Sequence, residues 1–200
     1  MRNVCIFAAS SPRIDQRYMD AAFALGEALA DHGLGLVFGA GRVGLMGACA
    51  RGVKAKGGRI TGVIPEKLHV PGIAFEECTE LIVTADMHER KATMERLSDG
   101  YIALPGGIGT FEELLEVLTL NQLGYLSTPV VIFNQLGYYD ALIAQLEESV
   151  AQGFADESCL KLFAVAGTPR EAVEALLAFQ QPQLPNKIKD AIRYDQKATT

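Results

Sequence analysis

Apolar and polar positions alternate along this chain in two kinds of block, short continuous runs and longer periodic segments. The short Val/Ile/Leu/Ala-rich runs predict seven β-strands, at residues 4–9, 34–38, 59–64, 81–84, 101–104, 130–133 and 163–165. The longer segments have helical spacing and predict six α-helices, at residues 15–31, 43–56, 86–98, 111–122, 138–152 and 168–179. A Pro-Gly pair lies within residues 65–77, which we expect to be irregular.

The order of these elements predicts an α/β fold. Strands that lie between helices are buried on both faces, which explains why these runs are continuously apolar and do not alternate. Repeated strand–helix units form parallel sheets with right-handed crossovers, so we expect a Rossmann-like, doubly wound parallel sheet with helices on both faces. We expect a single domain over residues 1–180 and a polar C-terminal tail over residues 181–200.

Two expected helix starts share the spacing Thr-x-x-Glu. Thr168, followed by Pro169 and Glu171, combines three signals of a helix N-terminus. Thr110 and Glu113 have the same spacing, which is typical of a capping box. However, apolar residues flank Glu113 on its own side of the helix, and a half-buried glutamate has a raised pKa unless a cation compensates. The sequence leaves open whether Glu113 is a cap or a functional carboxylate.

Composition and charge exclude several classes of protein. The 200 residues are 49% hydrophobic, as in ordinary globular domains, and the net charge of −6 provides no positive field to recruit nucleic acid. The four cysteines are far apart and form no C-x-x-C pair, which argues against a zinc site and favours reduced thiols. No apolar run is long enough for a signal peptide or a membrane span. We therefore expect a soluble cytoplasmic protein without a metal ion or a membrane partner.

A glycine-rich turn follows the strand expected at residues 101–104. It reads Pro-Gly-Gly-Ile-Gly-Thr and contains Gly106, Gly107 and Gly109. Glycine lets backbone N–H groups approach an anion closely, and the start of the next helix adds unpaired N–H groups and a positive dipole end. The sequence therefore predicts a phosphate-binding turn at residues 105–110.

A second glycine-rich segment, residues 39–47, follows the strand expected at residues 34–38. It contains G-x-G-x-x-G, which occurs in dinucleotide-binding proteins, but here it follows the second strand. It could bind a dinucleotide, or its glycines could serve only a tight turn and close helix packing. After the first strand, Ser10 offers a hydroxyl suited to ligand binding.

Two cations, Arg90 and Lys91, lie near the start of the helix expected at residues 86–98. Positive charge there opposes the helix dipole, which suggests a second duty, although a solvated helix face is a common alternative. The neighbouring His88 could act as a general acid or have only a structural role.

Four segments, in order between residues 4 and 154, resemble the LOG ("lonely guy") family. Residues 105–113 look like its P-G-G-x-G-T-x-x-E motif, and residues 87–91 resemble its Arg-Lys element. Residues 41–47 resemble its G-x-x-G-L-M-G segment, and residues 7–11 its first loop. The resemblance implies a homodimer that cleaves the N-glycosidic bond of cytokinin riboside 5′-monophosphates, and often of AMP, without a cofactor. The products would be the free base and ribose 5-phosphate.

The resemblance also implies roles for individual residues. Arg90 and Glu113 would be catalytic: Glu113 would stabilise positive charge at C1′ and take a proton from water, while Arg90 holds its charged form. The resemblance and the loops described above together indicate which residues contact a nucleoside monophosphate. These contacts are expected at Ser10, Gly41, Met87, Lys91, Gly106, Gly107, Ile108, Gly109, Thr110 and Thr119.

The chain departs from the family pattern at two places. Gly72 stands where an acidic residue often precedes the equivalent of Ile73, and Gly39-Ala40-Gly41-Arg42 replaces a run of glycines. Both departures bear on base preference more than on the reaction. Two alternatives remain open, a nucleotide-binding protein without turnover and a general purine monophosphate nucleosidase.

Overall fold

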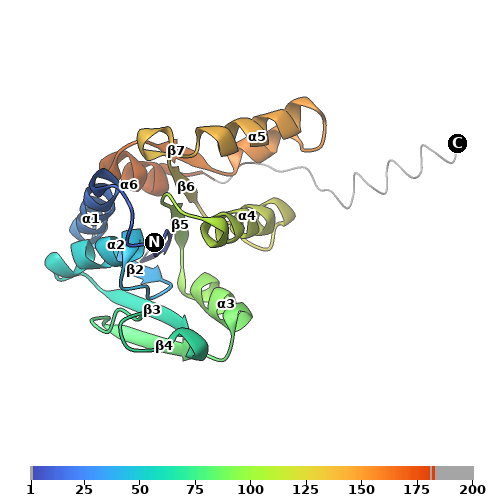
Figure 1. Ribbon diagram of the computed structural model, residues 1–200. Coiled ribbons are helices and arrows are strands. Elements are labelled where there is room, and N and C mark those ends of the chain that lie inside the picture. The colour runs from blue at the N-terminus through green and yellow to red at the C-terminus, as the bar shows by residue number, and fades with distance from the viewer. Residues whose placement is uncertain (1, 181, 183–200) are drawn as a thin grey trace, which may run out of the picture.

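A parallel β-sheet forms the centre of the molecule (Figure 1). The computed structural model describes residues 2–180 and 182. Seven strands pair in the spatial order β4-β3-β2-β1-β5-β6-β7, and every pair is parallel. The strands are β1 (Asn3–Phe7), β2 (Gly35–Phe38), β3 (Ile60–Pro65), β4 (Glu80–Thr84), β5 (Gly100–Ala103), β6 (Val130–Phe133) and β7 (Ala164–Ala166).

Six α-helices cover the two faces of this sheet, which confirms the predicted doubly wound arrangement. They are α1 (Gln16–Asp31), α2 (Gly44–Ala55), α3 (Met87–Leu97), α4 (Ile108–Leu123), α5 (Asp140–Ala151) and α6 (Pro169–Ala178). Figure 1 shows α1, α2 and α6 on one side of the strands and α3, α4 and α5 on the other. Three short 3-10 helices, which the sequence pattern did not predict, span Glu66–Leu68, Gln135–Gly137 and Glu157–Lys161.

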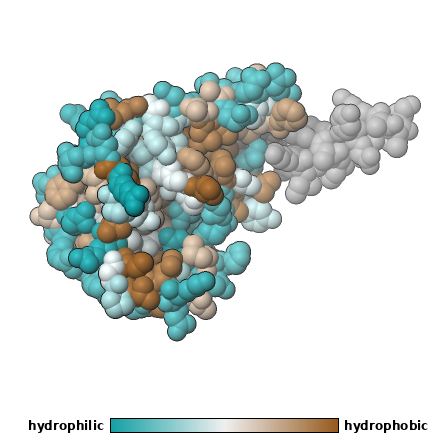
Figure 2. Space-filling model, viewed as in Figure 1, coloured by the Kyte–Doolittle hydropathy of each residue, from teal (hydrophilic) through white to brown (hydrophobic). Residues whose placement is uncertain are grey.

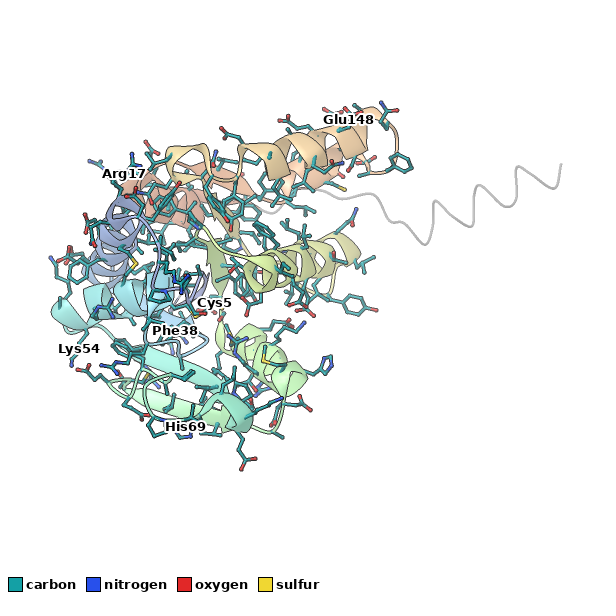
Figure 3. All side chains as sticks on the ribbon, in the orientation of Figure 1. Cys5, Arg17, Phe38, Lys54, His69 and Glu148 are labelled. Carbon is teal, nitrogen blue, oxygen red and sulfur yellow. The ribbon has the colours of Figure 1, made fainter. Side chains whose placement is uncertain are left out.

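The sheet separates two hydrophobic cores. One packs against α1, α2 and α6 and contains Phe38, while the other packs against α3, α4 and α5 and contains Cys5. Figure 3 shows both residues among the central strands, whereas the charged side chains of Arg17, Lys54 and Glu148 lie at the periphery. This two-sided burial is why the central strands are continuously apolar.

The strand order reverses beside β1, and this reversal positions the candidate site. The chain runs outward from β1 to β4, then returns to place β5 on the other side of β1. The loops that leave β1 and β5 are therefore neighbours, and the N–H of Ala9 donates to the carbonyl of Pro105 at 3.2 Å. In open α/β sheets, ligands bind at such a switch point, outside the carboxyl ends of the strands.

The helix start at Thr168 is confirmed, and the two outermost strands differ from expectation. The Thr168 hydroxyl accepts from the N–H of Glu171, and the Glu171 carboxylate accepts from the N–H of Thr168, which completes the capping box. In contrast, β4 and β7 are only partly buried because each has a single neighbouring strand. The expectation that every strand is buried on both faces is wrong at these edges.

All four cysteines are free thiols. Burial raises the pKa of Cys49 to about 12 and that of Cys78 to about 11, so both thiols stay protonated near neutral pH. Across the described residues, no helix has both the length and the apolar character needed to cross a bilayer. The predicted tail, residues 181–200, lies outside the described part of the chain except for residue 182, so the predicted domain boundary stays a prediction.

Candidate active site

A cavity of about 420 Å³ opens at the switch point of the sheet. Its walls come from the loop after β1, the turn after β2, the segment after β3, and the first turns of α3 and α4. Of the residues that the sequence singled out for a site, those lining the cavity are Ser10, Gly41, Met87, Arg90, Gly107, Gly109, Thr110 and Glu113.

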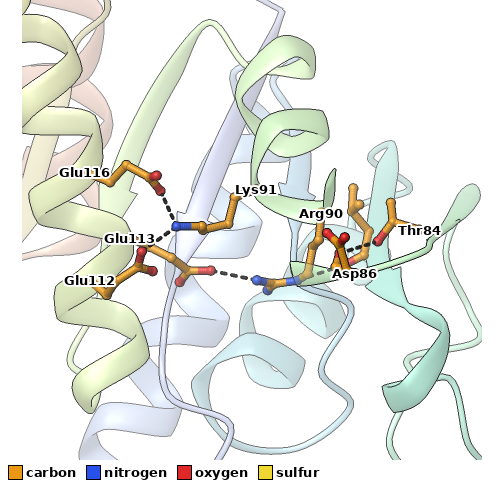
Figure 4. A network of polar contacts seen from close by, with 8 residues as sticks. Thr84, Asp86, Arg90, Lys91, Glu112, Glu113 and Glu116 are labelled. Carbon is orange, nitrogen blue, oxygen red and sulfur yellow. Dashed lines mark hydrogen bonds and ion pairs between the residues drawn. The ribbon is translucent and has the colours of Figure 1, made fainter. Parts of the chain in front are cut away.

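A buried ion pair between α3 and α4 forms the floor of this cavity. Nη1 of Arg90 donates to Oε1 of Glu113 at 2.9 Å, and both side chains are less than a tenth exposed. The guanidinium also donates through Nε to the carbonyl of Val63, at the end of β3, at 3.3 Å. Figure 4 shows the guanidinium and the carboxylate facing each other across the gap between the two helices.

Gly39, at the end of β2, leaves the space that the guanidinium occupies. A Cβ at this position would overlap Nη2 of Arg90. The glycine is therefore required by Arg90 and not by a turn conformation, because its φ does not lie in the left-handed region. The first glycine of the G-x-G-x-x-G segment thus supports the ion pair.

The capping-box interpretation of Glu113 is wrong. Helix α4 begins at Ile108 with Gly107 as its N-cap, and no side chain caps it. Thr110 lies inside the first turn, so its hydroxyl cannot serve as the N-cap group. Glu113 instead faces α3 and pairs with Arg90, which places a carboxylate on the cavity floor.

The environment of Glu113 sets its protonation. Burial raises the pKa of its carboxyl above the ordinary range, and the charge and hydrogen bond of Arg90 oppose this rise without cancelling it. Only Oε1 has a hydrogen-bond partner among the residues that the structure describes. Glu113 is therefore an ionisable group that can accept a proton more readily than an exposed glutamate.

Lys91 lies beside this pair but does not line the cavity. Its ammonium pairs with Glu112 and Glu116, the latter at 2.8 Å, and its side chain is mostly buried between α3 and α4 (Figure 4). The interpretation of Arg90 and Lys91 as a solvated helix face is therefore wrong, because both side chains join α3 to α4. The expected contact between Lys91 and a ligand would require the ammonium to leave these carboxylates.

The glycines of residues 105–110 fall into two groups. A Cβ on Gly106 would overlap the side chain of Thr110, so this buried glycine serves chain packing. A Cβ on Gly107 or Gly109 would meet nothing within 4 Å, and neither residue has a positive φ. Neither packing nor backbone conformation demands glycine at these two positions, which line the cavity. At both positions no side chain covers the backbone on the side from which a ligand would approach.

In the segment 39–47, by contrast, chain packing accounts for Gly39, Gly44 and Gly47. Gly44 has φ +67°, and a Cβ there would lie 2.5 Å from the carbonyl oxygen of Ala9. A Cβ on Gly47 would overlap the carbonyl of Arg42. These contacts favour the turn interpretation over dinucleotide binding.

One wall of the cavity is apolar, and the sequence pattern missed it. It is formed by Met46, Ile64, Leu68 and Ile73, which join the expected Met87. The segment after β3, expected to be irregular, folds back over the β2–α2 turn: the N–H of Arg42 donates to the carbonyl of Ile73 at 2.9 Å. Ligands generally bind at the carboxyl ends of strands, which could have indicated this segment. The side chains that it contributes to the wall are apolar, however, so they form no recognisable binding motif in the sequence.

Three other candidates lie outside the cavity. Ile108 is 88% exposed, and Thr119 lies on the same outer face of α4, where its hydroxyl donates to the carbonyl of Leu115. His88 is exposed on α3 and does not line the cavity, which removes the geometric basis for its proposed role as a general acid.

Comparisons with known proteins identify the family of this chain. The family described as "Possible lysine decarboxylase" matches residues 46–176. A rice protein named "Probable cytokinin riboside 5′-monophosphate phosphoribohydrolase LOGL2" (Oryza sativa subsp. japonica) is 42% identical over 190 residues, covering 94% of this chain and 78% of the relative. Cytokinin riboside 5′-monophosphate phosphoribohydrolase LOG5 of Arabidopsis thaliana is 43% identical over 179 residues, covering 90% and 78%. The chain belongs to the LOG family.

Solved structures show the same fold at lower identity. The molybdenum cofactor carrier protein of Chlamydomonas reinhardtii superposes on this LOG-family chain with a TM-score of 0.66 at 21% identity, covering 89% of this chain and 97% of that one. The molybdenum cofactor binding protein of Rippkaea orientalis gives 0.62 at 20% identity, covering 88% and 94%. At this identity the likeness shows the fold alone.

The substitution Arg90→Ala tests the ion pair of this LOG-family site. It leaves the Glu113 carboxylate buried without its cation, so we expect the free energy of unfolding to fall by about 3–5 kcal/mol near pH 8. Near pH 5 the loss should be smaller. The reason is that the pKa of Glu113 is higher in the folded state than in the unfolded state. Protonation of this carboxyl at low pH therefore stabilises the fold, and that stabilisation is lost as pH rises through the folded pKa. Urea unfolding at both pH values measures the difference.

The double variant Arg90→Ala/Glu113→Gln is the control. It removes the titrating carboxyl, so the change in stability relative to the native chain should vary much less with pH. An equal loss of stability at both pH values in Arg90→Ala would contradict a buried pair between these residues.

Proposed function

We propose that this protein hydrolyses the N-glycosidic bond of nucleoside 5′-monophosphates, releasing the free base and ribose 5-phosphate. The observation that carries the proposal is the spacing of two features on α4. A bare glycine turn forms the N-terminus of the helix, and a buried carboxylate lies about one turn further on, in the same cavity. The names of the LOG relatives describe this reaction for those proteins.

The phosphate is proposed to bind on Gly107, Ile108 and Gly109. No acceptor among the described residues takes a hydrogen bond from the N–H groups of these three residues. Unpaired N–H groups at a helix N-terminus attract a phosphate, and the absence of side chains at the two glycines lets it approach the backbone. The phosphate is remote from the C1′–N bond, and the binding energy gained there positions the ribose for reaction.

Glu113 is the proposed base and charge stabiliser. As the C1′–N bond breaks, its electron pair leaves with the base, which takes up a proton to become the free base, and positive charge builds on the ribose ring. A carboxylate near C1′ stabilises that charge and accepts a proton from the water that forms the new C1′–O bond. The raised pKa of Glu113 suits this proton transfer because it brings the carboxyl closer to neutral pH.

Arg90 is proposed to position Glu113 and to keep it ionised. Its hydrogen bond holds one carboxylate oxygen at 2.9 Å, and its charge lowers the pKa of Glu113 against the effect of burial. The guanidinium also lines the cavity, where it adds positive charge to a site for an anionic substrate.

The description "Possible lysine decarboxylase" gains no support from the site. No lysine is among the described residues that line the cavity. Lys91, which follows the lining residue Arg90 in the chain, is paired with Glu112 and Glu116 between two helices. Hydrolysis by a carboxylate, in contrast, uses only groups that the cavity contains.

The apolar wall is proposed to receive the base. Met46, Leu68, Ile73 and Met87 offer contact surface but no hydrogen-bonding groups to read the edge of a purine. An aliphatic substituent on the base would bury further apolar surface against this wall. This favours prenylated adenine over guanine.

A homodimer built on the outer face of α4 is also proposed. Ile108, Leu115 and Leu123 are exposed on this face, and Figure 2 shows apolar surface over α4 and toward α5. Contiguous apolar surface of this kind marks interaction sites in water-exposed proteins. Thr119 lies on the same face, so in such a dimer it would be covered by the partner.

A cytoplasmic location is proposed as well, since all four cysteines are unpaired.

The substitution Glu113→Gln tests the hydrolase directly. We expect kcat for adenine release from AMP to fall by about 10²- to 10⁴-fold because amide nitrogen and oxygen cannot accept the proton from water. Glu174→Gln, on the surface of α6, is the matched control and should retain full activity. Liquid chromatography of released adenine is the measurement. Turnover retained by Glu113→Gln contradicts its catalytic role, and AMP binding without any adenine release by the native chain favours a non-catalytic nucleotide-binding protein.

The base preference is tested with three substrates. We expect kcat/KM for isopentenyladenine riboside 5′-monophosphate to exceed that for AMP by about tenfold or more, and that for AMP to exceed that for GMP, because the prenyl group buries against the apolar wall. Equal values for AMP and GMP, with no gain from the prenyl group, would instead indicate a general purine monophosphate nucleosidase.

The dimer is tested with Leu115→Glu. Light scattering after size exclusion should give about twice the chain mass of 21.5 kDa for the native protein and a single chain mass for the variant. Leu177→Glu provides the control, because Leu177 is exposed to a similar degree on α6, across the sheet from α4. A dimer that survives Leu115→Glu would place the interface elsewhere.

A further inference from the structure

We propose that Tyr138 is a positioning residue that aims the peptide groups of the phosphate-binding turn. The proposal rests on the function proposed above, in which the phosphate binds to Gly107, Ile108 and Gly109. Tyr138 and Tyr139 immediately precede α5, far along the chain from this turn, and nothing in the sequence pattern marked them for a role in the site.

Three successive carbonyl groups, those of residues 104 to 106, accept hydrogen bonds from other parts of the described chain. The carbonyl of Leu104 accepts from the hydroxyl of Tyr139 at 2.7 Å. The carbonyl of the next residue, Pro105, accepts from a backbone N–H of the loop after β1 at 3.2 Å. The carbonyl of Gly106 accepts from the hydroxyl of Tyr138 at 2.5 Å. No carbonyl of this stretch is left free to turn toward an incoming anion.

The hydrogen bond from Tyr138 has a direct consequence for phosphate binding. The carbonyl of Gly106 and the N–H of Gly107 belong to one planar trans peptide group, in which they point in opposite directions. Holding the carbonyl on Tyr138 therefore aims the N–H of Gly107 the other way. Gly107 has no side chain to resist rotation of this peptide, so an external partner is needed to fix it.

Tyr139 supports the same turn in a different way. The peptide group after Leu104 ends on the nitrogen of Pro105, which carries no hydrogen, so the hydroxyl of Tyr139 aims no N–H group. It anchors the end of β5 instead, and its ring is fully buried against Phe111 of α4. Tyr138 is therefore the residue whose hydroxyl bears on the ligand, although it does not line the cavity itself.

The backbone before Tyr138 is shaped to deliver this side chain. Leu136 and Gly137 both have positive φ, +55° and +72°, and a non-glycine residue such as Leu136 is strained in that conformation. The side-chain oxygen of Asn134 then accepts from the N–H of Tyr139 at 2.7 Å, which fixes the pair of tyrosines. The ring of Tyr138 meets those of Tyr18 and Tyr139 edge to face, so its hydroxyl is held in place.

The substitution Tyr138→Phe tests this role because it removes only the hydroxyl. We expect the Kd for ribose 5-phosphate, measured by calorimetry, to rise by about tenfold, since the Gly106 peptide is free to rotate. With AMP as substrate, KM should rise by a similar factor while kcat changes by less than about twofold. Tyr18→Phe is the matched control: Tyr18 belongs to the same aromatic cluster, and among the described residues its hydroxyl has no hydrogen-bond partner.

The possible outcomes separate this proposal from the hydrolase itself. A Kd for ribose 5-phosphate that Tyr138→Phe leaves within about twofold of the native value overturns the positioning role alone. A loss of kcat with unchanged KM overturns it as well, since that is the mark of a smaller active fraction. If the native chain binds ribose 5-phosphate but releases no adenine from AMP, the hydrolase proposal fails while the binding comparison still decides the role of Tyr138. If the native chain does not bind ribose 5-phosphate, the role of Tyr138 fails, while adenine release from AMP still decides the hydrolase proposal separately.

Discussion

The buried ion pair between Arg90 and Glu113 is the constraint on which the rest of the site depends. Taking two charges out of water is costly, and the cost is recovered only when the geometry of the pair is well defined. Arg90 comes from α3 and Glu113 from α4, so the pair fixes the distance between the two helices that flank the switch point. The carbonyl of Val63 holds the same guanidinium to the sheet. One interaction thus sets both the shape of the cavity floor and the protonation of its carboxylate.

Glycine serves two different purposes around this pair. Gly39 and Gly106 make room for other groups of the protein, the guanidinium of Arg90 and the side chain of Thr110. Gly107 and Gly109 make room for nothing within the described chain, and they are the positions where the proposed phosphate meets the backbone. The sequence shows the same residue type in all four places, and only the surroundings of each Cβ position distinguish packing from binding.

The fold was predictable from the sequence because hydrophobic periodicity reports local burial. Strand order, by contrast, is a property of the whole chain, and so the partial exposure of the edge strands β4 and β7 was missed. The two Thr-x-x-Glu segments show the same limit at one residue. At Thr168 the surroundings are solvent and the local capping box forms. At Thr110 the glutamate pairs instead with an arginine of the preceding helix, α3, and the capping box does not form. The apolar wall and the tyrosines before α5 were missed because they reach the site through the tertiary fold.

The open space around Gly107 and Gly109 has an evolutionary meaning. Since no packing contact or backbone conformation requires glycine at either position, another residue there would leave the fold intact and obstruct only the proposed phosphate. Gly39 and Gly44 have no such freedom, because their replacement disturbs the protein itself. Selection on folding and selection on ligand binding therefore act on different glycines of one chain. A lineage can abandon its ligand by a single substitution at residue 107 or 109 and still inherit a stable scaffold for another task.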